Sequence, residues 1–375
     1  MSQRTRPPFR ADHVGSLLRP PELLAARADF EAGRIDATAL KAAEDDAIRD
    51  AVALQREVGL KAATDGEFRR ASWHMDFIYA LGGVTRVEEE GLHVRFHNEE
   101  GDIEFNPPAS RVEDRIHLDG TIFGDAFTFL RDTVADDQVP KLTIPSPSMV
   151  HYRGGREAIS EEVYPDLDAF WDDLAAAYAQ EIAGLHALGC RYLQLDDTSL
   201  AYMNDPSQRE FVRSRGGDPE HQHETYIATI NKALADRPAD MALTTHLCRG
   251  NHHSSWVASG GYDFVAEPLF NDLQVDGFFL EYDDERSGTF EPLRFVPKDK
   301  TVVLGLVTTK RPALESKDEL KRRIEEATQY IDLDQLCLSG QCGFSSTTAG
   351  NKLTRDDQKA KLERIVEVAD EVWGS

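Results

Sequence analysis

The chain has 375 residues, of which 41% are hydrophobic, enough to build one large α/β barrel or two ordinary domains. It carries 42 basic and 67 acidic residues and a formal net charge of −25. This acidic excess repels nucleic acids and anionic membrane surfaces, so we expect neither as a partner.

The N-terminal stretch MSQRTRPPFRADHVGS contains no apolar core of the kind that a secretory signal needs, and no later stretch approaches the length of a membrane span. We therefore expect a cytoplasmic protein. Four cysteines are too few for a disulfide scaffold, and in a reducing compartment a functional cysteine more often binds metal or takes part in catalysis. Cys190 and Cys337 stand among apolar neighbours and are expected in the core.

Short apolar runs that end in polar or reactive residues predict eight strands: 10–16, 60–68, 141–147, 191–197, 241–248, 277–283, 301–307 and 335–343. Helical periodicity between them predicts helices over 38–58, 167–188, 221–235, 317–331 and 356–372. This alternation favours an α/β fold of the (β/α)8 TIM-barrel type, as a single domain over residues 1–375. Neither a dinucleotide-binding nor a P-loop glycine motif occurs, so an open nucleotide-binding sheet is not favoured.

The segment 83–120 departs from this alternation. It is charged, its residues alternate in polarity, and it has turn signals at EEGD and NPP. This pattern predicts an inserted antiparallel β-hairpin and not a further barrel unit.

The fifth predicted strand ends with a histidine and a cysteine two positions apart, in LTTHLCRGN. Residues i and i+2 of a strand point to the same face, so His246 and Cys248 can reach one ion, although both could also be ordinary buried residues. In a barrel, the ends of the sixth and eighth strands would add Glu281 and Cys342. Two thiolates, an imidazole and a carboxylate form a ligand set that selects zinc over harder ions.

Six motifs follow one another along nearly the whole chain: DHVGS, TDGEF, LQLDD, HLCRGN, FLEYD and SGQCGF. Together they resemble the catalytic half of cobalamin-independent methionine synthase, and more closely the stand-alone, single-barrel members of that family. The resemblance implies an S-methyltransferase in which zinc binds the thiol of homocysteine. Carried over by motif, the zinc ligands are His246, Cys248, Glu281 and Cys342. By the same resemblance, Ser16 meets the substrate carboxylate, while Glu67 and Asp196 bind its ammonium group.

The chemistry of a thiol explains this choice of ligands. A free thiol has a pKa of ~8.5, only its thiolate is a good nucleophile, and direct zinc coordination removes the proton near neutral pH. Two cysteinates and a glutamate give the site a net negative formal charge, which stays unchanged if a substrate thiolate replaces Glu281. The bound sulfur would then remain electron-rich, whereas three neutral histidines suit water activation better.

Other roles are open to the proposed substrate-binding residues. Ser16 could cap the next helix, Glu67 could form an ion pair with Arg69 or Arg70, and Asp196 could be a solvated carboxylate at a strand end. Several residues in or beside the motifs have no assigned role: His13, Arg249, His252 and His253.

The methyl donor stays open between 5-methyltetrahydrofolate, methylcobalamin, another small donor and a small carrier protein. The family places a tryptophan after the third strand, where a pterin stacks, and this chain has His151 and Tyr152 there.

Two other functions also stay open: a related zinc-dependent thiol alkyltransferase that joins an epoxide to a thiol, and a non-catalytic zinc-binding barrel. If the thiol substrate of such an alkyltransferase carried a sulfonate, its binding would need arginines such as Arg249 in place of an acidic pocket. Assembly into a homo-oligomer is a further open expectation.

Overall fold

Six parallel strands form the central sheet of this computed structural model, which describes residues 4–87, 94–98, 101–105 and 109–374. Every strand pairs with its neighbours in chain order, so the sheet runs β12-β11-β10-β9-β8-β7. In that order the strands are Leu336–Gly340, Thr301–Val307, Gly277–Glu281, Ala242–Leu247, Tyr192–Asp197 and Leu142–Pro145. Nearly all of their residues are buried, as expected of parallel strands covered on both faces.

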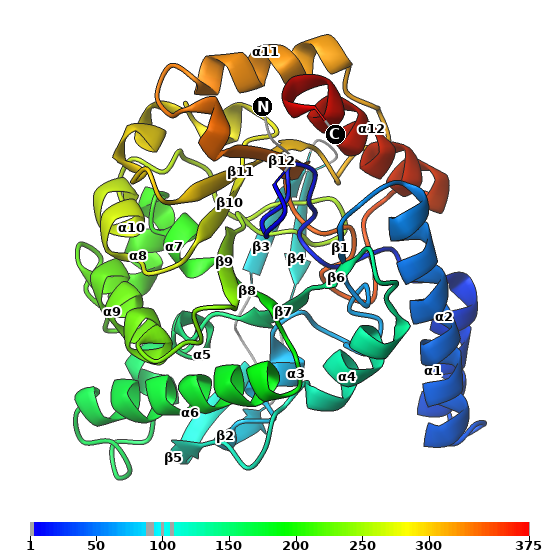
Figure 1. The fold of residues 1–375 in the computed structure, drawn as a ribbon. Helices are drawn as coiled ribbons and strands as arrows, with labels where there is room; N and C mark the ends of the chain where they lie inside the picture. Colours follow the sequence, from blue (N-terminus) through cyan, green and yellow to red (C-terminus); the bar gives the residue numbers. More distant parts are fainter. Residues whose placement is uncertain (1–3, 88–93, 99–100, 106–108, 375) are drawn as a thin grey trace.

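Shorter pairings extend this sheet at both edges. β1 (Ala62–Ala63) pairs in parallel with β6 (Val139–Pro140), which leads directly into β7. At the opposite edge, Ala11 forms a parallel bridge with Leu338 of β12. The strands thus succeed one another around a common interior, inside a ring of helices (Figure 1).

The first predicted strand, 10–16, is wrong as a strand, because it contributes only the isolated bridge at Ala11. The side chain of Asp12 accepts hydrogen bonds from the backbone N–H groups of Phe9 (3.1 Å) and His13 (2.8 Å). These local bonds occupy donors that a ladder would use. Among the described residues, no ladder runs between this segment and β1.

The five helices predicted from periodicity are present, with ends that differ by a few residues: α2 (Ala37–Glu57), α6 (Asp168–Ala187), α9 (Gln222–Leu234), α11 (Lys317–Ala327) and α12 (Arg355–Trp373). Further helices, mostly shorter, were not predicted: α1 (Pro21–Glu31), α3 (Met75–Ile78), α4 (Gly124–Thr133), α5 (Ser148–His151), α7 (Ser199–Tyr202), α8 (Pro206–Ser214) and α10 (Ala266–Asp272). Within the described ranges, no helix is long and apolar enough to cross a membrane.

The insertion predicted at 83–120 consists of two antiparallel pairs. β2 (Gly82–Val87) pairs with β5 (Ala109–His117), and β3 (Val94–Asn98) pairs with β4 (Gly101–Phe105). The antiparallel character of the insertion is therefore as the alternating sequence predicts.

The β3–β4 pair contacts the segment that follows β9. His97 and Trp256 exchange both backbone hydrogen bonds, at 2.6 and 2.9 Å. The side chain of Asn98 donates to Ser255 Oγ at 2.9 Å. These bonds fix the insertion beside the loop that carries the predicted metal ligand Cys248.

A buried ion pair joins the N-terminal segment to the strands. Lys141, between β6 and β7, places Nζ 3.2 Å from Asp12 Oδ1 and 2.5 Å from the carbonyl oxygen of His13. The hydroxyl of Tyr192 donates to the other carboxylate oxygen of Asp12 at 2.8 Å, and Nζ lies 4.0 Å from the ring centroid of Phe279. Neither charged side chain is exposed, so the attraction between the two charges is needed to offset the cost of removing each from water.

We expect Lys141→Met to destabilise the fold by about 3–5 kcal/mol, because it leaves the Asp12 carboxylate buried without its cation. Denaturant-induced unfolding measures this change. The double variant Asp12→Asn/Lys141→Met removes both charges and should be clearly more stable than the single variant. An unfolding midpoint unchanged by Lys141→Met would show that the ion pair does not support the fold.

Candidate metal centre and substrate cavity

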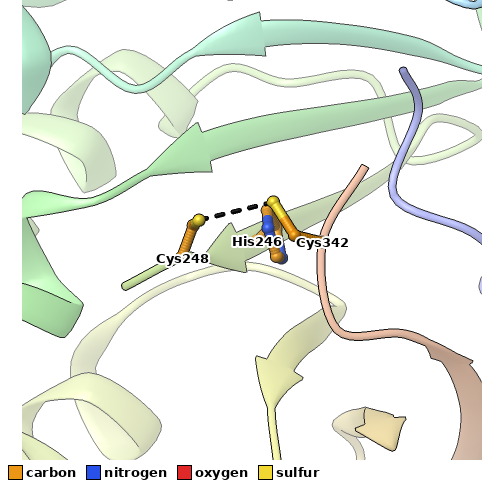
Figure 2. A group of neighbouring side chains, drawn as sticks. All are labelled: His246, Cys248 and Cys342. Atoms are coloured by element: carbon orange, nitrogen blue, oxygen red, sulfur yellow. Dashed lines mark hydrogen bonds between the residues drawn. The ribbon is translucent and has the colours of Figure 1, made fainter. Parts of the chain in front are cut away.

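Three of the four predicted metal ligands lie together at the carboxyl ends of β9 and β12. His246 is in β9, Cys248 follows the last residue of that strand, and Cys342 lies two residues beyond β12. The two sulfur atoms are 3.4 Å apart, and Figure 2 shows them joined by a dashed line beside the ring of His246. One ligand atom from each residue lies within 4.8 Å of the other two, and all three residues are buried.

The chemistry of these three side chains fits a soft divalent metal such as zinc. Both ring nitrogens of His246 are buried without a hydrogen-bond partner among the described residues, although buried polar atoms are normally paired. The hydrogen bond from Cys248 and the neighbouring His246 hold the pKa of the Cys342 thiol well below its ordinary value. Two cysteine sulfurs and an imidazole without a partner among the described residues provide three soft ligands for one ion.

The fourth predicted ligand, Glu281 at the end of β10, has cationic partners of its own. Its carboxylate accepts hydrogen bonds from Arg249 N (2.9 Å), Lys310 Nζ (3.0 Å) and Arg286 Nη2 (3.5 Å). Burial opposes ionisation of this carboxyl, but the charges of Lys310, Arg249 and Arg286 lower its pKa to about 2. Glu281 is not part of the three-residue group found among the described residues, so its place at the metal stays a prediction.

Lys310 was missed by the sequence analysis. It stands three residues after β11 and is buried, so it belongs to the same row of strand ends that indicated Glu281 and Cys342. Position after a predicted strand was therefore an available signal, because charged residues there converge with those of neighbouring strands.

A cavity of about 340 Å³ opens beside the metal group. Its wall includes the three clustered ligands and the three residues predicted to bind substrate, namely Ser16, Glu67, Asp196, His246, Cys248 and Cys342. Residues separated by more than three hundred positions in the sequence thus share one cavity. The roles assigned to them stay predictions, but their convergence is a feature of the structure.

Glu67 lines this cavity, and only one of its two carboxylate oxygens has a hydrogen-bond partner among the described residues. Its Oε1 accepts a hydrogen bond from Thr143 Oγ1 at 3.0 Å, whereas Oε2 is buried without a partner among the described residues. Burial raises the pKa of this carboxyl, against the opposing charge of Arg70. Arg70 lies 3.9 Å away, and Arg69 pairs instead with Glu44 and another acidic residue of α2. The ion pair considered from the sequence is thus long and leaves one oxygen available.

Asp196 lies opposite His246 in the register of β8 and β9. Its Oδ1 accepts a hydrogen bond from Gln194 Nε2 at 2.7 Å. Burial raises its pKa to about 7, although the charge of His246 acts in the other direction. Two partly desolvated carboxyl groups on one cavity wall favour a bound cation, because a cation restores their ionised form.

Ser16 does not cap the following helix, since α1 begins at Pro21 with Pro20 as its N-cap. Its hydroxyl oxygen accepts a hydrogen bond from the backbone N–H of Ser345 at 3.1 Å. The hydroxyl proton is then free to donate to a ligand, because a hydroxyl offers one donor as well as acceptor lone pairs.

The residues without an assigned role separate into two groups. His252 lines the cavity and its ring lies 5.2 Å from that of Phe96. His13, Tyr152, Arg249 and His253 are not among the residues that line it. Tyr152 packs against Tyr202 at 5.7 Å and donates its hydroxyl proton to a glutamine, so this residue, which stands where the family places a tryptophan, lies behind the wall.

Arg249, the arginine considered for a sulfonate substrate, is fully occupied by the protein. Its guanidinium donates to the backbone carbonyls of Gly260, Gly261 and Glu281 and to the hydroxyl of Tyr262, at 2.8 to 3.1 Å. The side chain is entirely buried. Arg249 therefore shapes the loop after β9 and does not face the cavity.

Aromatic residues that the sequence analysis did not select form part of the cavity wall: Trp73, Phe96 and Tyr202. Trp73 follows the second predicted strand and not the third, and Phe96 comes from the inserted β3. The position of an insertion relative to a site depends on tertiary contacts such as the His97–Trp256 bridge, so the local sequence carries no clear signal for it.

A family profile described as cobalamin-independent synthase, catalytic domain, matches residues 113–371. The chain belongs to this family. It is 46% identical to the uncharacterized protein YxjH of Bacillus subtilis, over 99% of this chain and 96% of that protein. It is 25% identical to the methionine synthase of Pyrococcus abyssi, over 88% and 85% of the two chains.

Among solved structures, a candidate B12-independent methionine synthase from Listeria monocytogenes is similar, with a TM-score of 0.79 and 38% identity. The match covers 99% of this chain and 100% of that one. The resemblance and the α/β, TIM-barrel-type fold expected from the sequence are thus confirmed. The chain is a methyltransferase-family protein of the methionine synthase type.

We expect the protein purified without chelator to contain about one zinc ion per chain, and Cys248→Ser and Cys342→Ser each to lose most of it, because a hydroxyl is a poor zinc ligand compared with a thiolate. Elemental analysis of the purified variants measures the loss. Cys337→Ala is the matched control, since this cysteine is buried in β12 outside the cavity and its variant should retain zinc. Full occupancy in both serine variants would exclude these cysteines as ligands.

Proposed function

We propose that this family member transfers a methyl group to the thiol of homocysteine or a close analogue, in a zinc-dependent reaction that makes methionine. The observation that carries the proposal is the shared cavity, in which soft metal ligands adjoin two buried carboxyl groups. A ligand that fits both features has a thiol at one end and an ammonium group at the other. The similarity to a methionine synthase supports the same assignment.

Zinc would be held by His246, Cys248 and Cys342, with Glu281 as the fourth ligand when substrate is absent. When bound, the ion would lower the pKa of a coordinated thiol so that the substrate sulfur is a thiolate near neutral pH. Lys310 and the Arg249 N–H compete for the carboxylate of Glu281. This competition supports Glu281 as a weak ligand that a substrate sulfur can replace.

The amino-acid part of the substrate would be bound by the protein alone. The free oxygen of Glu67 and the carboxylate of Asp196 would accept charge-assisted hydrogen bonds from the ammonium group. The hydroxyl of Ser16 would donate to the substrate carboxylate. These contacts orient the sulfur toward the metal group and restrict its motion, which lowers the entropic barrier to transfer.

In the overall transfer, the thiol loses its proton, a sulfur–carbon bond forms, and the bond between the methyl group and the donor breaks. The donor keeps that electron pair. The candidate donors remain 5-methyltetrahydrofolate, methylcobalamin, another small methyl donor and a methylated carrier protein. Glu67 and Asp196 in the cavity wall favour an amino-acid thiol over the sulfonate thiol of an epoxide-dependent alkyltransferase.

Turnover tests this proposal directly. The zinc-loaded protein is incubated with homocysteine and with each candidate donor in turn, and methionine is measured by mass spectrometry. Methionine formed with one donor, and lost in Cys342→Ser, would establish both substrates. An absence of methionine with every donor, together with no measurable affinity for homocysteine, would overturn the assignment.

We expect Glu67→Gln and Asp196→Asn to bind homocysteine about 10- to 150-fold more weakly while retaining zinc, because each loses one charge-assisted bond worth ~1.5–3 kcal/mol. Calorimetric titration of the zinc-loaded variants measures this affinity. The control ligand is 4-mercaptobutanoate, which lacks the ammonium group and should bind the wild type and both variants alike. Equal losses for the two ligands would show that these carboxyl groups do not recognise the ammonium.

A further inference from the structure

Lys310 is a buried cation that lies between two carboxylates. It stands three residues after β11, and its Nζ atom lies 3.0 Å from Glu281 Oε1 and 3.8 Å from Asp283 Oδ2. The three side chains are only 5%, 0% and 1% exposed, respectively. A charge this deep in the protein needs a partner, because its removal from water is costly. Lys310 therefore keeps a carboxylate within reach even if one of the two moves.

Both oxygens of the Glu281 carboxylate are bound by donors of the protein. Oε1 accepts hydrogen bonds from Lys310 Nζ and, at 3.5 Å, from Arg286 Nη2, and Oε2 accepts one from the backbone N–H of Arg249 at 2.9 Å. Arg249 directly follows the predicted ligand Cys248. The carboxylate thus lies next to the metal group, yet it is outside the three-residue cluster found in the described ranges. We call this position of Glu281, bound by Lys310, Arg286 and Arg249 N, the docked position.

The docked position is built from groups that other contacts hold in place. Arg286 donates from Nε and Nη2 to Asp284 Oδ2, at 2.9 and 2.7 Å. Its guanidinium carbon lies 4.2 Å from the centre of the Trp256 ring. These contacts do not involve Glu281, so Arg286 has support of its own if the glutamate leaves.

Asp283 is the carboxylate that Lys310 can pair with in the absence of Glu281. Its Oδ1 atom is buried without a hydrogen-bond partner in the part of the chain that the structure describes, and Arg286 Nη2 is 3.8 Å from that atom. Both cations beside Asp283 are thus longer contacts than a hydrogen bond. A closer approach of Lys310 would compensate the Asp283 charge better.

Exchange of a ligand at the metal group moves a charged carboxylate inside the protein. In the proposed function, a substrate sulfur takes the place of Glu281, and the side chain of Glu281 has no exposed surface. A carboxylate released into the interior without a cation would be strongly destabilised. The docked position provides that cation in advance, so the free energy of the exchange depends on Lys310.

We propose that Lys310 is a positioning residue that pairs in turn with Glu281 and Asp283. It holds the Glu281 carboxylate in the docked position while the thiol substrate is bound, and it pairs with Asp283 while Glu281 ligates the metal. The inference rests on the proposed function and adds to it the residues that determine how readily Glu281 is displaced. Neither Lys310 nor Asp283 lines the substrate cavity, so both act through Glu281.

Lys310→Met tests this role through two affinities that should change in opposite directions. Zinc affinity without thiol, measured by competition with a chromophoric chelator, should rise, because Glu281 loses the partner that competes with the metal. Homocysteine affinity of the zinc-loaded protein, measured by calorimetry, should fall by about 10-fold or more, because the displaced carboxylate loses a charge-assisted bond. Lys310→Arg keeps the charge and should retain part of the wild-type homocysteine affinity.

Asp283→Asn removes the other partner of Lys310 and should shift both affinities the opposite way. Zinc should bind more weakly without thiol and homocysteine more tightly, since Lys310 then depends on Glu281 alone. This variant keeps the lysine, so it tests the proposal even if Lys310→Met does not fold. Lys141→Met is the matched control, because it separates a buried lysine from a buried aspartate outside the cavity, and its zinc affinity should equal that of the wild type.

A double-variant cycle with Glu281→Gln separates positioning from a general effect on the fold. The neutral amide needs no cation, so addition of Lys310→Met to Glu281→Gln should change homocysteine affinity by about twofold or less. An equal loss in both backgrounds, or wild-type affinities in Lys310→Met, would overturn the proposal. Failure of the proposed function is distinguishable, because homocysteine would then not bind the wild type, whereas the zinc affinities would still report on Lys310 and Asp283.

Discussion

The close approach of two buried cysteine sulfurs is the constraint on which the rest of the site depends. Cys248 and Cys342 come from strand ends 94 positions apart and place their sulfur atoms 3.4 Å from each other, beside His246, whose ring nitrogens have no partner in the described part of the chain. Thiolates at this separation repel one another unless a cation lies between them, which is why soft metal ligation is the natural use of the cluster. The parallel order of β9 to β12 makes the approach possible, because it aligns the carboxyl ends of all the strands involved.

Charge around this cluster is distributed in a way that suits exchange of a ligand. Glu281 is buried, yet its charge is stabilised by Lys310 and by the backbone N–H of Arg249. On the cavity side, Glu67 Oε2 and Arg153 Nη1 are both buried without a hydrogen-bond partner among the described residues. Buried groups of opposite charge that have no partner destabilise the folded protein, and such groups are typical of binding sites. They supply preformed partners for a cationic and an anionic group of bound ligands.

The parts of this arrangement that the sequence predicted are those set by local periodicity. The i, i+2 spacing of His246 and Cys248 follows from strand geometry, and the strand ends indicated Cys342. The prediction of a strand at 10–16 was wrong because the Asp12 side chain accepts hydrogen bonds from nearby backbone N–H groups. The pattern of apolar residues does not reveal such an interaction. Trp73, Phe96 and Arg153 were missed because their positions at the cavity depend on loops and on an insertion fixed by distant contacts. Tyr152, which follows the third predicted strand, packs behind the cavity wall and not on it, so the methyl donor stays open.

The central claim is that the cluster binds zinc and that zinc binds the substrate thiol. X-ray absorption of the zinc-loaded protein, recorded with and without saturating homocysteine, tests both parts. We expect two sulfur neighbours from Cys248 and Cys342 to become three, with loss of an oxygen neighbour and release of about one proton as the thiol ionises. A zinc shell that is the same in both spectra, with no proton released, would contradict the account.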